Sequence, residues 1–138
     1  MCWHCDKNKF QMQMAEKDVE VYKILYKDKE GNLVSPVYER FPWQLEFLYT
    51  SFLSIKLTWY KGDYEFQGNE GLHSYMRKPQ YHPSTEEYTY NRKFKCNTHY
   101  PTGGLLVKCI IPKGRFFCVN EDEEVISDAL KVIEIINE

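Results

Sequence analysis

Large apolar side chains alternate with polar ones along several short runs of this chain, and that period of two constrains the fold more than any other feature. Residues 19–27 and 105–111 follow it, and both are rich in Val, Ile, Leu and Tyr. The β-branched residues at 132–136 also favour an extended backbone over a helix. Because turn residues at 29–32 and 112–114 separate such runs, the pattern predicts an antiparallel sheet.

Two hairpins are expected from these runs. The first spans 19–37 and turns at Lys-Glu-Gly-Asn, 29–32. The second joins 105–111 to 115–119 through Pro-Lys-Gly, 112–114, where Pro and Gly suit a type I turn followed by a bulge. That turn sets Lys108 opposite Cys118, whereas a two-residue turn at 113–114 would set Cys109 there.

Short helices are expected beside the sheet. Residues 9–17 are compatible with one, 43–52 with a helix after Pro42 or with two short strands, and 86–90 with a helix capped by Ser84 or with a strand. The prediction is an α+β fold, mainly antiparallel sheet with one or two short helices. Its 138 residues make a single domain, in which 1–18 form a lead segment.

Composition excludes several classes of protein. The chain is 43% hydrophobic and carries a net charge of −2, so neither disorder nor a globally basic nucleic-acid binder is indicated. The N-terminus lacks the basic and apolar regions of a signal peptide, and no apolar run reaches the roughly 18 residues of a membrane span. With five cysteines, an odd number, we expect a cytoplasmic protein with free thiols and no membrane contact.

Charge is uneven along the chain. Residues 56–115 hold ten Lys or Arg against five Asp or Glu, whereas 116–138 hold one against seven. The simplest interpretation is that the two regions lie near each other and neutralise one another.

Four residues have the spacing of a zinc site. Cys2 and Cys5 form a C-x₂-C pair, and Cys96 and His99 a C-x₂-H pair. Together they would complete a tetrahedral Cys₃His site of the structural kind. The alternative is that the first pair sits on a frayed terminus and Cys96 is a buried thiol. Zinc is the single cofactor that the sequence suggests.

A second candidate site follows the glycine at 71. His73, Ser74 and Tyr75 come directly after that turn and offer three polar groups for the wall of a pocket. No nucleophile elbow surrounds Ser74, so no catalytic residue is assigned. The alternative is a tucked His and Tyr that backbone groups satisfy.

Tyrosines and cations interleave between 75 and 100. Stacking rings and phosphate-binding cations are what single-stranded nucleic acid requires. However, Glu86 and Glu87 interrupt the stretch and no RNP-like run is present, so nucleic acid is not the favoured partner.

Several motifs in their order along the chain resemble a group of small uncharacterised proteins of bacteriophages and gut-bacterial mobile elements. They are Cys-x₂-Cys at 2–5, Val-Tyr-Lys at 21–23, Ser-Pro-Val-Tyr at 35–38, Gly-Leu-His-Ser-Tyr at 71–75, Lys-Cys-Ile-Ile-Pro-Lys-Gly at 108–114 and Glu-Val-Ile-Ser-Asp at 124–128. The resemblance covers most of the chain and implies a host-cytoplasm setting.

A fainter similarity is to the ADP-ribosyltransferase fold. Those enzymes place a basic residue on an early strand, a Ser element after a Gly and a late Glu pair, an order that Lys23, Ser74 and Glu124 (with Glu121 and Glu123) follow. Lys replaces the usual Arg, and His-Ser-Tyr the usual Ser-Thr-Ser. The similarity implies a divergent NAD-using or nucleotide-binding enzyme with Lys23, His73, Tyr75 and Glu124 lining a cleft.

The function that the sequence favours is a soluble, non-enzymatic binding module of phage or mobile-element origin, with a structural zinc as an option. The predicted ligand-binding residues are Lys23, His73, Ser74, Tyr75 and Glu124. The alternatives are the divergent transferase or nucleotide-binding enzyme and a single-stranded nucleic-acid binder. An unidentified protein or small molecule is the expected partner, and a free strand edge is compatible with a monomer or a homodimer.

Overall fold

The computed structural model describes residues 3–35, 42–90, 98–100 and 102–136, with the backbone alone at 98–100. These residues form strands and turns, and the strands pair antiparallel in three sheets. The expected short helices are therefore a wrong prediction, and the described fold is all-β. It follows that the described residues include no helix of the length and apolarity that a membrane span requires.

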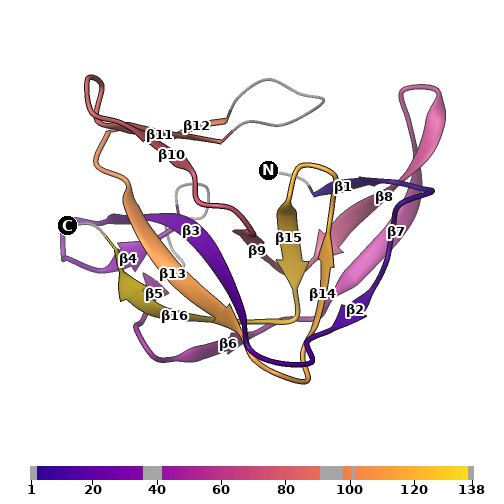
Figure 1. The fold of residues 1–138 in the computed structure, drawn as a ribbon, viewed down its shortest axis with the longest axis horizontal. Coiled ribbons are helices and arrows are strands. Elements are labelled where there is room, and N and C mark those ends of the chain that lie inside the picture. The colour runs from indigo at the N-terminus through magenta and orange to yellow at the C-terminus, as the bar shows by residue number, and fades with distance from the viewer. Residues whose placement is uncertain (1–2, 36–41, 91–97, 101, 137–138) are drawn as a thin grey trace.

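The main sheet winds through the whole molecule (Figure 1). In spatial order its strands are β2 (Gln13–Met14), β14 (Phe116–Val119), β15 (Glu124–Ser127), β9 (Leu72–Tyr75), β3 (Val19–Lys27), β13 (Leu105–Ile111), β16 (Ala129–Ile135) and β6 (Leu48–Thr50). Two small strands, β4 (Leu33–Val34) and β5 (Pro42–Trp43), continue from β3.

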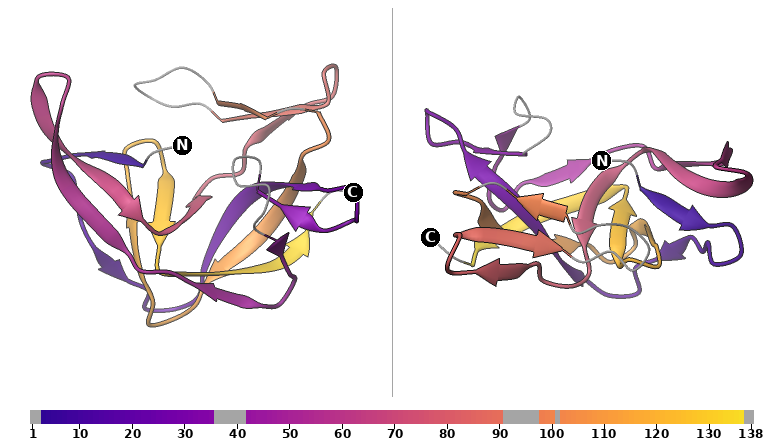
Figure 2. Two further views of the ribbon diagram at one scale, coloured as in Figure 1. Left: turned by 180° about the vertical axis from the view of Figure 1, so that it is seen from behind. Right: turned by 90° about the horizontal axis from the view of Figure 1, so that it is seen from above.

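Two smaller sheets project from this body, as both views of Figure 2 show. One consists of β1 (His4–Asp6), β8 (Asp63–Glu70) and β7 (Ser54–Tyr60). The other consists of β10 (Gln80–His82), β11 (Glu87–Tyr90) and β12 (Thr98–Tyr100).

The main sheet folds into two halves that face each other across a dry interior. A single pair, Tyr22 with Tyr75, joins β9 to β3, so the sheet bends sharply there. The chain passes directly between the halves at residues 15–18, from β2 to β3, and at two corners, residues 112–115 from β13 to β14 and Asp128 from β15 to β16. Such corners are typical of strands that switch between packed sheets.

Asp128 holds these two corners together. Its carboxylate accepts hydrogen bonds from the Phe116 N–H at 3.1 Å and from Arg115 Nε at 3.2 Å. Its own N–H donates to the Phe116 carbonyl, and its carbonyl accepts from the Ser51 N–H at 2.9 Å. One side chain and its peptide groups thus join three segments that are distant in sequence.

Three buried clusters fill the spaces between these layers. The interior between the two halves holds twelve buried residues, including Val21, Leu25, Val107, Cys109 and Val125. A second cluster lies between β11 and the outer side of β3 and β13, and a third lies under the β1–β8–β7 sheet. Both faces of β3 and β13 are covered by these clusters, so residues of either parity are buried. This explains why the two strands carry large residues at nearly every position.

Tertiary hydrogen bonds explain why the segment 9–17 is not helical. The Ala15 N–H donates to the Arg115 carbonyl at 2.8 Å, and the Gly114 N–H donates to the Ala15 carbonyl at 2.7 Å. Residues 13–14 pair with β14. The backbone groups that a helix would use internally are therefore taken by the 112–115 corner.

The other two ambiguous segments resolve in favour of strands. Residues 43–52 contribute to β5 and β6, separated by a turn in which Glu46 has φ 63°. Residues 87–90 form β11, which pairs with β10 and β12. The first hairpin is confirmed over β3 and β4, where the Asp28 carboxylate accepts the N–H groups of Glu30 and Asn32.

The second expected hairpin is wrong. A turn does form, since the Arg115 N–H donates to the Pro112 carbonyl at 3.1 Å, but β13 and β14 do not pair. Cys109 lies beside Val21 and Val132, and Cys118 lies beside Ile126. The strands separate because Ala15 bonds to the corner on both sides, which sends each strand into a different half of the sheet.

Candidate functional site

Five predicted ligand-binding residues come together on three neighbouring strands. Lys23 lies on β3, Glu124 lies on β15, and the His-Ser-Tyr run occupies β9 between them. Glu124 pairs with Tyr75, and Ile126 pairs with His73. Residues about 50 positions apart in the chain are thus on neighbouring strands.

The five residues nevertheless lie on two faces of the sheet. Directly paired residues point to the same side, so His73, Tyr75 and Glu124 share the outer face with Ile126. Ser74 pairs with Val125, which belongs to the interior cluster, and Lys23 alternates with Val21 and Leu25 of that cluster. Lys23 and Ser74 therefore face the interior and do not share a surface with the other three.

Lys23 is held by a backbone group and a ring. Its Nζ donates to the His73 carbonyl at 2.6 Å and lies 5.2 Å from the centre of the Trp43 ring. Because the ammonium is removed from water among apolar side chains, the pKa of Lys23 falls from 10.5 to about 8. In this geometry Lys23 is a buried cation whose hydrogen bond links β3 to β9.

His73 is kept neutral. Burial lowers the pKa of its imidazole from 6.5 to about 4, and the nearby Lys23 cation acts in the same direction. Ser74 is 3% exposed, and its hydroxyl has no hydrogen-bond partner among the described residues. Neither group has, within the described chain, the partner that would make it a nucleophile or a general base.

Glu124 is part of a polar turn between β14 and β15. The Asn120 side chain donates to Glu124 Oε1 at 3.0 Å and to the His4 carbonyl at 2.8 Å. The side-chain oxygen of Asn120 accepts hydrogen bonds from the backbone N–H groups of Asp122 and Glu124. The indole of Trp3 donates to the Glu124 carbonyl at 2.9 Å, so this turn is tied to the first residues of the chain.

The predicted zinc ligands are described in part. Cys2 and Cys96 lie outside the described residues, and the backbone alone of His99 is placed, on β12. Cys5 is buried, and its Sγ lies 3.4 Å from Glu121 Oε1. Burial raises the pKa of this thiol to about 12, and the Glu121 carboxylate adds to the shift. The described residues contain no group of three ligands that could hold a metal, and the zinc site stays a prediction.

Three tyrosines of the 75–100 stretch lie in a core, whereas Tyr81 is exposed. Tyr75, Tyr88 and Tyr90 are buried together with Ile24 and Leu106, and the rings of Tyr75 and Tyr90 lie 4.3 Å apart. Arg77 lies over the Tyr90 ring and Lys78 lies over Tyr22. Three of the rings expected to stack on bases are thus used in packing, while residues 91–97 lie outside the described chain.

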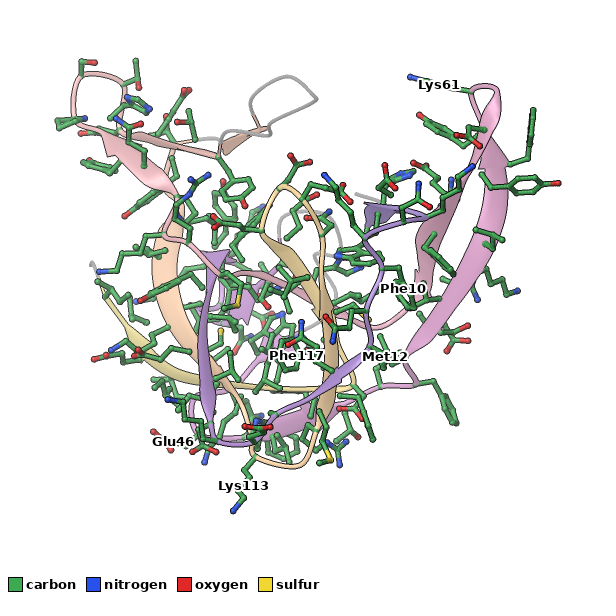
Figure 3. All side chains as sticks on the ribbon, turned by 45° about the vertical axis from the view of Figure 1, so that its right-hand side comes forward. Phe10, Met12, Glu46, Lys61, Lys113 and Phe117 are labelled. Atoms are coloured by element: carbon green, nitrogen blue, oxygen red, sulfur yellow. The ribbon has the colours of Figure 1, made fainter. Side chains whose placement is uncertain are left out.

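The structure shows an apolar surface that the sequence analysis did not identify. On the β7–β8 hairpin, Leu57 pairs with Phe66 and Trp59 pairs with Tyr64, so these four side chains share one face. Leu57, Trp59 and Tyr64 are 53%, 61% and 50% exposed. The hairpin projects from the body, and Figure 3 shows Lys61 at its tip.

This face continues onto the body of the protein. Phe10 stacks on Phe66 with ring centres 4.2 Å apart, and Leu53 packs in the same cluster. Leu53 then contributes to a cavity of about 320 Å³ beside the Asp128 corner. The other residues lining the cavity are Met12, Ser51, Phe52, Phe116 and Asp128.

We call this series of apolar residues the apolar strip. It runs from the hairpin tip to the cavity and consists of Trp59, Tyr64, Leu57, Phe66, Phe10, Leu53, Met12, Phe52 and Phe116. Phe52 is 82% exposed at one end, and Figure 3 shows Phe10 and Met12 between the hairpin and Phe117 of the main sheet. The exposed apolar residues gather at the two ends of the strip, with Leu57, Trp59 and Tyr64 on the hairpin and Met12, Phe52 and Phe116 at the cavity.

One sequence signal could have indicated part of the strip. The strict alternation of large apolar and polar residues at 55–59 predicts a strand, and β7 confirms it. Lys61 and Gly62 have φ values of 49° and 91°, as a two-residue type I′ turn requires. The alternation identifies the apolar face of the hairpin, whereas its exposure depends on where the hairpin sits in the fold.

Comparison with known proteins adds no relative. No protein-family model, no curated protein and no solved structure matches this chain.

Proposed function

We propose that this protein is a non-enzymatic binding module that docks an apolar segment of a partner protein along the apolar strip. The observation that carries the proposal is the exposure of large apolar side chains on the hairpin and around the cavity at the Asp128 corner, with the half-buried Phe66, Phe10 and Leu53 between them. A surface of that composition is costly in water, and covering it with a partner removes that cost.

The residue types of the strip favour a protein partner. Leu57, Met12 and Phe52 offer exposed apolar surface, aliphatic, thioether and aromatic respectively. Met and aromatic residues are enriched in the centres of protein interfaces, and Met adapts its shape to different apolar side chains. The cavity is large enough to take one bulky side chain of the partner as an anchor.

Two charged groups near the strip, Asp128 and Lys7, are already engaged. The Asp128 carboxylate bonds to Arg115 and to the Phe116 N–H, and Lys7 at the hairpin pairs with Asp63 at 2.8 Å. The partner is therefore recognised by apolar contact and shape. A structural zinc on Cys2, Cys5, Cys96 and His99 remains compatible with this function, and metal analysis of purified protein tests it.

A peptide-display selection tests the proposal. Random peptides are selected on the wild-type protein and then measured against Leu57→Thr/Trp59→Thr, which keeps β-forming residues on the hairpin but removes its apolar face. We expect the selected peptides to be rich in aromatic and aliphatic residues and to lose at least about tenfold in affinity for the variant, or about 1.4 kcal/mol.

The matched control is Lys56→Thr, on the opposite face of the same strand, which should bind the peptides as the wild type does. A selection that yields no apolar peptides, or peptides that bind the double variant equally well, would contradict the proposed function.

A further inference from the structure

Strand β7 is an unusually long open edge. It has seven residues and, within the described part of the chain, pairs with β8 alone. The other strands at the ends of the described sheets, β1, β2, β5, β6, β10 and β12, have two or three residues each. Short edges are a common protection against edge-to-edge pairing, and β7 lacks that protection.

The hairpin turn determines which backbone groups of β7 face the open edge. A two-residue turn closes on a pair that exchanges both hydrogen bonds, which here is Tyr60 with Asp63. Because the direction of the N–H and C=O groups alternates along a strand, Thr58 and Lys56 also point toward β8. The groups of Ile55, Leu57 and Trp59 therefore point outward.

The outward groups limit how a second β7 can pair antiparallel with the first. In an antiparallel ladder outward residues must meet outward residues, so Leu57 can face Leu57, Ile55 or Trp59 of the other copy. With Leu57 facing Ile55, Lys56 would lie opposite Lys56 of the other copy, and like charges directly opposite are destabilising. With Leu57 facing Leu57, each Lys56 lies opposite a Thr58.

We propose that two copies of this chain pair antiparallel through β7, with the twofold axis at Leu57. In that register Ile55 of each copy meets Trp59 of the other, and the three facing pairs each exchange two backbone hydrogen bonds. Side chains of Ile55, Leu57 and Trp59 stay on one face, so large apolar groups meet apolar groups across the junction. The contact is self-complementary, as a twofold dimer requires.

Pairing at this edge would join the two β1–β8–β7 sheets into one and merge the two apolar strips into a single longer surface. It uses the backbone edge of β7, whereas peptide docking uses the side-chain face. The dimer and the proposed binding function can therefore fail independently, and the two experiments distinguish them.

Sedimentation equilibrium over a range of concentrations tests the proposal with charge variants at the twofold axis. The wild type should approach twice its 16.6 kDa as concentration rises. Leu57→Lys and Leu57→Glu each place like charges against each other and should shift the monomer–dimer midpoint to higher concentration by at least about tenfold. An equimolar mixture of the two variants should restore the dimer, because Lys then faces Glu.

The matched control is Leu45→Lys, a leucine of similar exposure in the turn between β5 and β6, which should dimerise as the wild type does. Circular dichroism and thermal unfolding of each variant show that loss of the dimer is not loss of the fold. A wild type that stays monomeric at millimolar concentration overturns the proposal. So does a Leu57→Lys variant that still dimerises, or a mixture that fails to recover.

Discussion

Replacing Lys23 by Met should stabilise the protein at neutral pH, although it removes a hydrogen bond. The Lys23 ammonium lies among the apolar side chains of the interior, with one carbonyl, that of His73, at 2.6 Å and the Trp43 ring at 5.2 Å. Met has similar length and fills the same space without a charge. A buried charge replaced by a well-packed apolar group is often neutral or stabilising.

The magnitude follows from the pKa of Lys23. The pKa of Lys23 is 10.5 in the unfolded chain and about 8 in the folded one. This difference means that keeping Lys23 charged at pH 7 lowers the free energy of unfolding by about 3 kcal/mol. The hydrogen bond to the His73 carbonyl offsets about 1 kcal/mol of this. We therefore expect Lys23→Met to raise the free energy of unfolding by about 2 kcal/mol at pH 7.

Urea unfolding at several pH values provides the assay. Between pH 8 and 10.5 the unfolded chain binds the Lys23 proton and the folded chain does not, so wild-type stability gains about 1.4 kcal/mol per pH unit from this group. Lys23→Met lacks that gain, and its advantage should shrink from pH 8 to pH 9. A variant less stable than the wild type at pH 7, or an advantage independent of pH, would refute the buried-cation interpretation.

Two further predictions concern the neighbouring residues. Because burial holds the pKa of His73 near 4 against 6.5 when unfolded, its contribution to stability is complete above pH 6.5 and is lost as pH falls toward 4, by about 1.4 kcal/mol per pH unit. His73→Gln should flatten that part of a urea-unfolding profile, and an unchanged acid limb would count against a buried neutral imidazole. Gly71 has φ 151°, and a Cβ there would overlap Ile126 Cγ1 and lie 2.8 Å from its Cδ1. Gly71→Ala should therefore lower the free energy of unfolding, measured by thermal unfolding, by about 3 kcal/mol. The control Gly31→Ala, with φ 84° and open space around the added Cβ, should lower it by about 1 kcal/mol. Equal losses in the two variants would show that the contact with Ile126 does not matter.

The candidate ligand residues show how far a resemblance can predict a site. The similarity to the ADP-ribosyltransferase fold grouped Lys23, His73 and Glu124, and these three residues lie on adjacent strands. Their division between two faces could not be predicted, because a period of two assigns faces within a strand and says nothing about how neighbouring strands are aligned. The apolar strip was missed for a related reason, since exposure depends on which elements cover a face.

Local physics in the sequence predicted strands at 19–27, 55–59, 105–111 and 131–136, which correspond to β3, β7, β13 and β16, and turns at 29–32 and 61–63. Alternation, β-branching and residues that tolerate positive φ act within a few positions, and they need no knowledge of the rest of the chain. Apart from the hairpin of β3 and β4, the tertiary structure decided which strands pair, since backbone hydrogen bonds are the same for every sequence and do not distinguish one strand from another. Thus β13 pairs with β3 and β16 instead of β14, and residues 9–17 are extended instead of helical. Both outcomes follow from the hydrogen bonds between Ala15 and the 112–115 corner, while burial of the interior cluster fixes the remaining registers.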